Sequence, residues 1–142
     1  MSVIELTVRS HDRIGELARI TEPLARAKVN IRGIAIVDRG DDSQVRLILD
    51  NFVKGRQVLA DSGFQCTSAE VLAVEIENAP GELNRLAKCL ADAQINIKYT
   101  YPLHDRTPLC VLVIGVTEQE LDPAIQSLEK QGFSFLLEHG PE

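Results

Sequence analysis

Two short polar loops hold the residue types with the clearest chemistry for binding a small molecule. Each loop ends in a glycine at the predicted start of a helix, where free backbone N–H groups and the positive end of the helix dipole suit a carboxylate. An ionised Asp12 only accepts hydrogen bonds and therefore suits an ammonium group, whereas the amide of Asn78 both donates and accepts. The first loop is Asp12, Arg13, Ile14 and Gly15, and the second is Asn78, Ala79, Pro80 and Gly81. Their different chemistry predicts two unequal sites.

The two loops belong to two copies of one repeated unit. The shift that places Gly15 on Gly81 also aligns identical residue types throughout the helix and turn that follow. Such a match indicates a duplicated structural unit, and a repeat has to be settled before any other feature of the chain. The residues of the first copy that recur are Gly15, Glu16, Leu17, Arg19, Leu24, Ala25, Ala27, Asn30 and Ile31. We therefore predict two domains, 1–68 and 69–142.

Each copy reads as strand, helix, strand, strand, helix, strand. Residues 3–9 alternate with a period of two, which predicts a half-buried strand with Glu5 on the outer face. From Gly15 the period becomes helical, and apolar residues three or four apart form the inward stripe. These stripes are Leu17, Ile20, Leu24 and Ala27 in the first copy and Leu83, Leu86, Leu90 and Ala93 in the second.

The remaining elements follow from turn and cap signals. Apolar runs at 31–37 and 45–49 enclose a Gly/Asp cluster and predict a hairpin, and the runs at 95–103 and 109–116 predict its counterpart. Thr117 and Glu120 have the spacing of a capping box at the start of the last helix. Short strands are expected at 64–67 and 71–76, with the boundary between the copies at 68–70.

These elements predict an α+β fold. Each unit is a ferredoxin-like βαββαβ arrangement, an antiparallel sheet with helices on one face. The boundary at 68–70 has no Gly/Pro/Ser-rich linker, so we expect the two units to pack side by side.

Composition and charge limit the classes of partner that this protein can bind. The chain has 142 residues, 44% of them hydrophobic, and a net charge of −6 without any Lys/Arg run, which argues against nucleic acid and anionic membranes as partners. No apolar run approaches a membrane span, and no signal peptide is recognisable. The three cysteines are far apart and have no metal-binding spacing. We expect a cytoplasmic protein with no metal and no cofactor.

The repeated motifs resemble the ACT domain, a small-molecule-sensing module of amino-acid metabolism. Two copies of the ACT pattern together cover nearly the whole chain. Each copy has Asp/Asn-x-x-Gly-x-Leu after its first strand and Asn-Ile at the start of its second strand. These motifs are Asp12 to Leu17 with Asn30-Ile31 in the first copy and Asn78 to Leu83 with Asn96-Ile97 in the second. The resemblance implies that an amino acid is held at an interface, between the loop of one domain and the second strand of its partner. It further implies that Asn78 and Asn96 match an asparagine pair that holds ligand in some members, and that Asn30 matches the second member of that pair, with Asp12 in the place of the first.

Structural roles explain the same residues one at a time. Asp12 and Asn78 are good N-cap types at the start of a helix. Asn30 and Asn96 can simply turn the chain between helix and strand, and Gly15 and Gly81 can serve close packing. The preference for ligand binding rests on the combination.

Catalytic chemistry is not predicted. His11-Asp12 and His104-Asp105 are sequence neighbours in turns, whose side chains usually diverge, and no nucleophile motif or phosphate-binding loop is present. We therefore expect a non-catalytic regulatory protein that binds an amino acid between its repeats and forms a homodimer. The alternatives are a regulatory or interaction subunit of a separate enzyme of amino-acid metabolism, with vestigial ligand sites, and a small enzyme on a ferredoxin-like scaffold.

Overall fold

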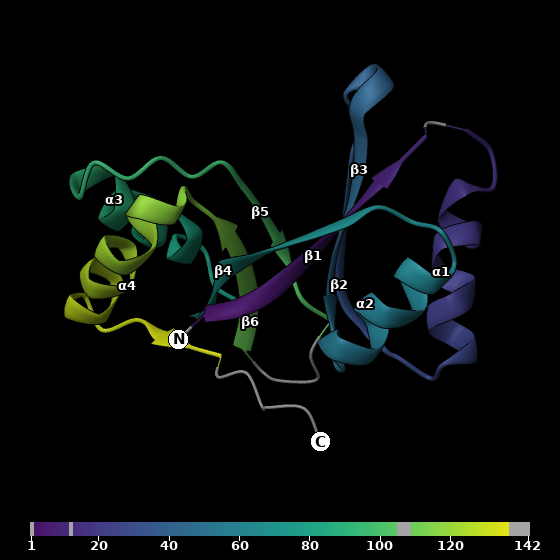
Figure 1. Cartoon of the computed structure of the whole chain (residues 1–142). Helices are drawn as coiled ribbons and strands as arrows, with labels where there is room; N and C mark the ends of the chain where they lie inside the picture. Colours follow the sequence, from purple (N-terminus) through teal and green to yellow (C-terminus); the bar gives the residue numbers. More distant parts are fainter. Residues whose placement is uncertain (1, 12, 105–108, 137–142) are drawn as a thin grey trace. The chain divides into compact units, whose positions relative to one another are not determined.

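The computed structural model describes residues 2–11, 13–104 and 109–136. Within the described residues the chain forms two compact units, one made of residues 4–69 and the other of residues 2–3 and 70–136 (Figure 1). Each unit combines an antiparallel sheet with two α-helices. The predicted α+β fold with two βαββαβ units is confirmed.

In the unit of residues 4–69, β3 lies between β1 and β2. The register pairs Val8 of β1 with Val45 and Ile34 of β2 with Leu47. Helices α1 and α2 contact each other (Figure 1). They bury their apolar residues, among them Ile20, Leu24 and Leu59, against the strands. The elements are β1 (Ser2–Ser10), α1 (Glu16–Arg26), β2 (Ile31–Val37), the 3-10 turn η1 (Gly40–Asp42), β3 (Ser43–Leu49) and α2 (Phe52–Asp61).

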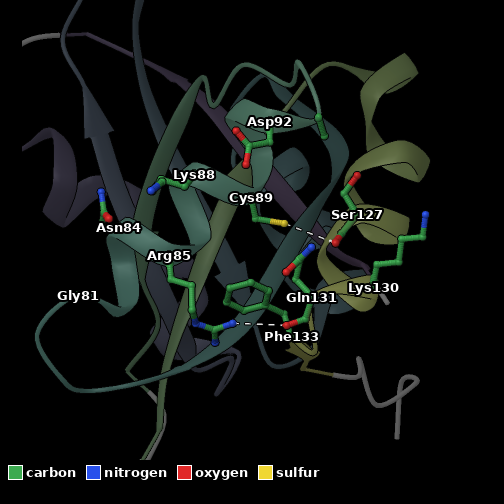
Figure 2. A pocket seen from close by; sticks show the side chains of 11 residues that line it. Gly81, Asn84, Arg85, Lys88, Cys89, Asp92, Ser127, Lys130, Gln131 and Phe133 are labelled. Carbon is green, nitrogen blue, oxygen red and sulfur yellow. Dashed lines mark hydrogen bonds between the residues drawn. The ribbon is translucent and has the colours of Figure 1, made fainter.

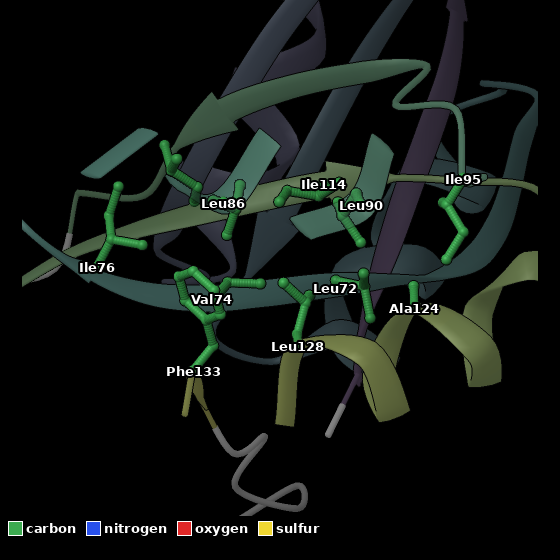
Figure 3. Packing of buried hydrophobic residues seen from close by; sticks show 11 residues of the cluster. Leu72, Val74, Ile76, Leu86, Leu90, Ile95, Ile114, Ala124, Leu128 and Phe133 are labelled. Atoms are coloured by element: carbon green, nitrogen blue, oxygen red, sulfur yellow. The ribbon is translucent and has the colours of Figure 1, made fainter. Parts of the chain in front are cut away.

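The second unit repeats this arrangement. Its strand β4 lies between β6 and β7, and β5 follows on the outer side of β6. Figure 3 shows Leu86 and Leu90 of α3 and Leu128 of α4 pointing toward Leu72 and Val74 of β4, and all five side chains are fully buried. The elements are β4 (Cys66–Glu77), α3 (Glu82–Asp92), β5 (Tyr99–Pro102), β6 (Leu109–Gly115), the 3-10 turn η2 (Glu118–Glu120), α4 (Leu121–Lys130) and β7 (Ser134–Phe135).

The helix stripes are confirmed except in their first turn. Ile20 and Leu86 are fully buried, but Leu17 and Leu83 are 41% and 51% exposed, so their predicted inward position is wrong. In α1 the buried residue of the first turn is Glu16, which stands four residues before Ile20 and therefore on the same face. Leu17 comes one position later, about 100° further round the helix.

Three smaller predictions are wrong. Residues 64–67 and 71–76 do not form two strands, because residues 66–77 are one continuous β4 that contains the predicted boundary at 68–70. The strand expected at 95–103 begins only at Tyr99. The outer-face position of Glu5 is wrong as well, since Glu5 is 1% exposed and pairs with Arg46 at 3.1 Å.

Candidate functional site

Gly15 and Gly81 begin α1 and α3 in the same unusual conformation. Their φ angles are +86° and +88°, in the left-handed region that favours glycine, and among the described residues no side chain caps either helix. The backbone N–H of Glu16, the first residue of α1, donates to the Arg13 carbonyl at 3.3 Å. The backbone N–H of Glu82, the first residue of α3, donates to the Ala79 carbonyl at the same distance. Asn78 is therefore not an N-cap, and Asp12 lies outside the described residues.

The other described residues of each loop are exposed. Ile14 has 104% of its reference area accessible, and Arg13 is exposed as well. Asn78, Ala79 and Pro80 are exposed in the second loop, so a molecule from solvent can reach both loops.

Glu16 closes the first loop through a cluster that the sequence analysis missed. Its carboxylate accepts the His11 backbone N–H at 2.7 Å and pairs with Arg19 at 2.7 Å, while the Arg19 guanidinium lies 4.5 Å above the Phe64 ring. Burial raises the pKa of Glu16, but the His11 hydrogen bond and the interactions with Arg19 and Arg13 outweigh burial and leave that pKa lowered. The carboxylate is therefore held ionised at the positive end of α1.

The second copy has a looser version of this cluster. Glu82 pairs with Arg85 at 3.3 Å with 21% of its side chain exposed, and Arg85 lies 3.9 Å above the Phe133 ring. The recurrence of Glu-x-x-Arg in both copies, with a Gly-Phe step after the second helix, was the available sequence signal. The first loop is thus anchored more firmly than the second.

Asn30 and Asn96 stand after the C-terminal ends of α1 and α3. The backbone N–H of Asn30 donates to Asp50 at 2.9 Å, and that of Asn96 donates to Glu120 at 3.1 Å. Both side chains are exposed, and neither forms a hydrogen bond with another residue that the structure describes. The turn-forming role is therefore carried by the backbone, while both amides stay accessible.

Glu120 is not part of a capping box. Its carboxylate accepts the Thr117 hydroxyl at 2.8 Å in addition to the Asn96 N–H, and the Thr117 side chain caps no backbone group. The predicted capping box is wrong, and this carboxylate instead fixes the turn before β5.

The loop residues and the asparagines lie at opposite ends of a helix. Helix α3 has 11 residues, which at 1.5 Å per residue separates its ends by roughly 16 Å. The same separation applies to α1. Ile31 and Ile97, next to the asparagines, are half-buried and pack against the core of their own unit. Within one repeat, an amino acid is too short to contact both ends.

A groove opens between α3 and α4 of the second unit (Figure 2). It has a volume of about 540 Å³, within the usual range of ligand pockets. Figure 2 shows Asn84 and Lys88 on one side and Lys130 on the other, with Cys89 and Phe133 between them. Burial, and then the charge of Asp92, raise the pKa of the Cys89 thiol, whose Sγ lies 3.4 Å from the Ser127 carbonyl oxygen. The other lining residues are Gly81, Arg85, Asp92, Ala93, Ser127 and Gln131.

The chain belongs to the ACT domain pair family, whose model matches residues 1–121. No match was found among curated proteins. In the part of the chain that the structure describes, no helix has the length and apolar character needed to cross a membrane.

Solved structures share the fold. Protein BT0572 from Bacteroides thetaiotaomicron is similar with a TM-score of 0.86 and 24% identity, covering 96% of this chain and 92% of that one. The regulatory subunit of aspartate kinase from Thermus thermophilus, in a ligand-free form, is similar with a TM-score of 0.62 and 13% identity, covering 91% and 92%. Both likenesses extend over the paired units.

Proposed function

We propose that this protein is a non-catalytic regulatory protein that binds an amino acid between ACT repeats. The loop of one repeat supplies backbone N–H groups of the first helical turn after Gly81 or Gly15, other than the bonded N–H groups of Glu82 and Glu16. The second strand of another repeat supplies the amide of Asn96 or Asn30. The observation that carries the proposal is the placement of these groups, exposed and about one helix length apart within each repeat. A ligand that uses both must therefore join two repeats.

In this arrangement, ligand binding can change how the repeats pack against each other. A molecule bound between two repeats favours the packing in which both contribute contacts, and it shifts the equilibrium by its difference in affinity for the two packings. The proposal gives two sites. One combines the loop from Asp12 to Gly15 with Asn96 and Ile97, and the other combines the loop from Asn78 to Gly81 with Asn30 and Ile31.

Thermal melting against the twenty amino acids tests the proposal. A ligand at one hundred times its Kd stabilises the folded state by about 2.7 kcal/mol, so one chemical class should raise the Tm clearly. Asn96→Ala should weaken this response without lowering the Tm of the ligand-free protein, because the Asn96 side chain is exposed.

Gln126→Ala is the matched control. Gln126 carries an exposed amide on α4, outside the proposed sites and the α3–α4 groove, and its removal should leave the response intact. A response that both variants keep would remove Asn96 from the site, and no response to any amino acid would count against the proposed function.

A second candidate is an interaction subunit that contacts a separate enzyme. The exposed apolar side chains of Ile14, Leu17 and Leu83 at the helix starts favour it, since large exposed apolar residues often mark partner surfaces. The similar protein from Thermus thermophilus is itself a regulatory subunit of aspartate kinase. This candidate predicts no amino-acid response but stable co-purification with one enzyme, weakened by Leu83→Asp.

We further propose that the protein is cytoplasmic and forms a homodimer. Its three cysteines, Cys66, Cys89 and Cys110, are all free thiols, which suits a reducing compartment. Strands β2 and β5 form the outer edges of their sheets, and such edges pair readily with another chain.

A further inference from the structure

The groove between α3 and α4 concentrates positive charge in an acidic protein. The chain carries a net charge of −6, yet the groove is lined by Arg85, Lys88 and Lys130 against the single carboxylate of Asp92. Neutral hydrogen-bond donors stand among these charges, namely Asn84, Ser127 and Gln131. Cations and neutral donors around one hollow are the lining that a polyanionic molecule requires.

The first repeat provides an internal comparison, because its helices are built on the same frame. Arg19 stacks on Phe64 as Arg85 stacks on Phe133. The backbone N–H of Phe64 bonds to Leu59 O, and that of Phe133 bonds to Leu128 O, so α2 and α4 end in the same way. Residues can therefore be matched between the two helix pairs.

The comparison of the two helix pairs shows that their packing does not require the lysines. Lys88 corresponds to Glu22, and Lys130 corresponds to Asp61, so both charges are reversed in the first repeat. The donor Ser127 corresponds to Val58. Since both repeats fold alike, the cations of the second repeat are not a requirement of helix packing.

The structure gives neither lysine a partner among the described residues. Lys88 and Lys130 are exposed, and among the described residues neither forms an ion pair or a hydrogen bond. Arg85 differs, since Glu82 and the Phe133 ring already hold its guanidinium. The two ammonium groups on opposite sides of the groove are thus available to a ligand (Figure 2).

We propose that the α3–α4 groove is a further ligand site, which meets the proposed amino-acid site only at Gly81 and takes a small molecule with two or more negative charges. The ligand lies between Lys88 and Lys130, and Asn84, Ser127 and Gln131 donate hydrogen bonds to it. A phosphorylated and a polycarboxylate metabolite share this chemistry.

Titration calorimetry with inorganic pyrophosphate and with citrate tests the site and distinguishes the two sources. The decisive variant is Lys88→Glu with Lys130→Asp, which gives the second repeat the charges of the first. Binding of at least one probe to the wild type is expected. The variant should weaken this binding by at least about tenfold, which is about 1.4 kcal/mol, because both ammonium groups that attract the anion are replaced by carboxylates.

A control variant distinguishes binding in the groove from a general effect of the protein's net charge. Arg26→Glu with Lys54→Glu changes the charge of the chain equally, at exposed positions of the first repeat, and should leave binding unchanged. Amide NMR shifts caused by the probe should be confined to α3, α4 and the residues up to Phe133. A variant with Lys88→Gln and Lys130→Gln covers the case in which the charge reversal unfolds the protein.

Binding of neither probe to the wild type would overturn the proposal. Equal weakening by the groove variant and the control, or shifts spread over both repeats, would overturn it too, because either result indicates general attraction between charges.

Discussion

Glu16 and Glu82 occupy equivalent positions at the starts of α1 and α3, but only Glu16 is buried. Glu16→Gln should lower the free energy of unfolding by about 1 to 3 kcal/mol, since it removes the charge that holds Arg19 and the His11 N–H. Glu82→Gln should lower it by less than about 1 kcal/mol, because its ion pair is partly exposed. Urea unfolding of the two variants makes the comparison, and equal losses would contradict the assigned role of Glu16.

The same carboxylate predicts a pH dependence. The pKa of Glu16 is lowered on folding from its ordinary value of 4.5, so its stabilising contribution is complete above that value and is lost as the pH falls through the folded-state pKa. The gap in unfolding free energy between wild type and Glu16→Gln should therefore be constant near neutral pH and should shrink below pH 4.5. A gap that grows on acidification would have the wrong sign.

At the residue scale, the sequence predicted the positions that depend on local geometry. Gly15 and Gly81 begin helices as expected, because a glycine before an amphipathic stripe is a local signal. The role of Glu16 was missed, because the recurring Glu-x-x-Arg pattern does not show by itself that Arg19 lies over Phe64, a residue far along the chain. Whether Asn78 and Asn96 bind ligand remains a prediction.

At the element scale, the start of each helix depends on one left-handed glycine. A Cβ on Gly81 would meet nothing within 4 Å, so Gly81→Ala adds no clash and its cost comes from the backbone alone. We expect a loss of about 1 to 2 kcal/mol in unfolding free energy, with a smaller loss for Gly81→Asn, because asparagine tolerates this conformation better. Gly15→Ala should behave alike.

Chemical denaturation of these variants checks the prediction. Alanine variants as stable as the wild type would mean that the helix starts do not need a positive φ. Amide NMR shifts confined to the loop would show that the rest of the unit is unchanged.

Two of the incorrect predictions, the capping box and the break at 68–70, were made from local patterns. Thr117 and Glu120 have the spacing of a capping box, yet Glu120 turns to the backbone of Asn96, which is remote in sequence. For the capping box, a contact with another segment decided the outcome over a local preference. Residues 68–70 were expected to separate two short strands, yet they continue β4.

At the scale of the whole molecule, the repeat determined what could be predicted. Two aligned copies gave the order of strands and helices and the ACT resemblance, which the family match confirms. The groove between α3 and α4 escaped prediction because its lining residues come from two helices separated by β5 and β6. The charge contrast between the copies becomes meaningful only once α2 and α4 are seen to end alike.

The proposed homodimer can be tested at a sheet edge. Ile36 lies on the edge strand β2 with 58% of its area exposed, and a charged residue on an edge strand opposes pairing with another chain. If dimers form by joining these edges, Ile36→Lys should shift the protein to monomer in sedimentation velocity at concentrations where the wild type is dimeric. Val53→Lys, an equally apolar and exposed residue on α2, should not. Dissociation by Val53→Lys alone would assign the contact to the helices, and a wild type that stays monomeric at high concentration would rule out the dimer.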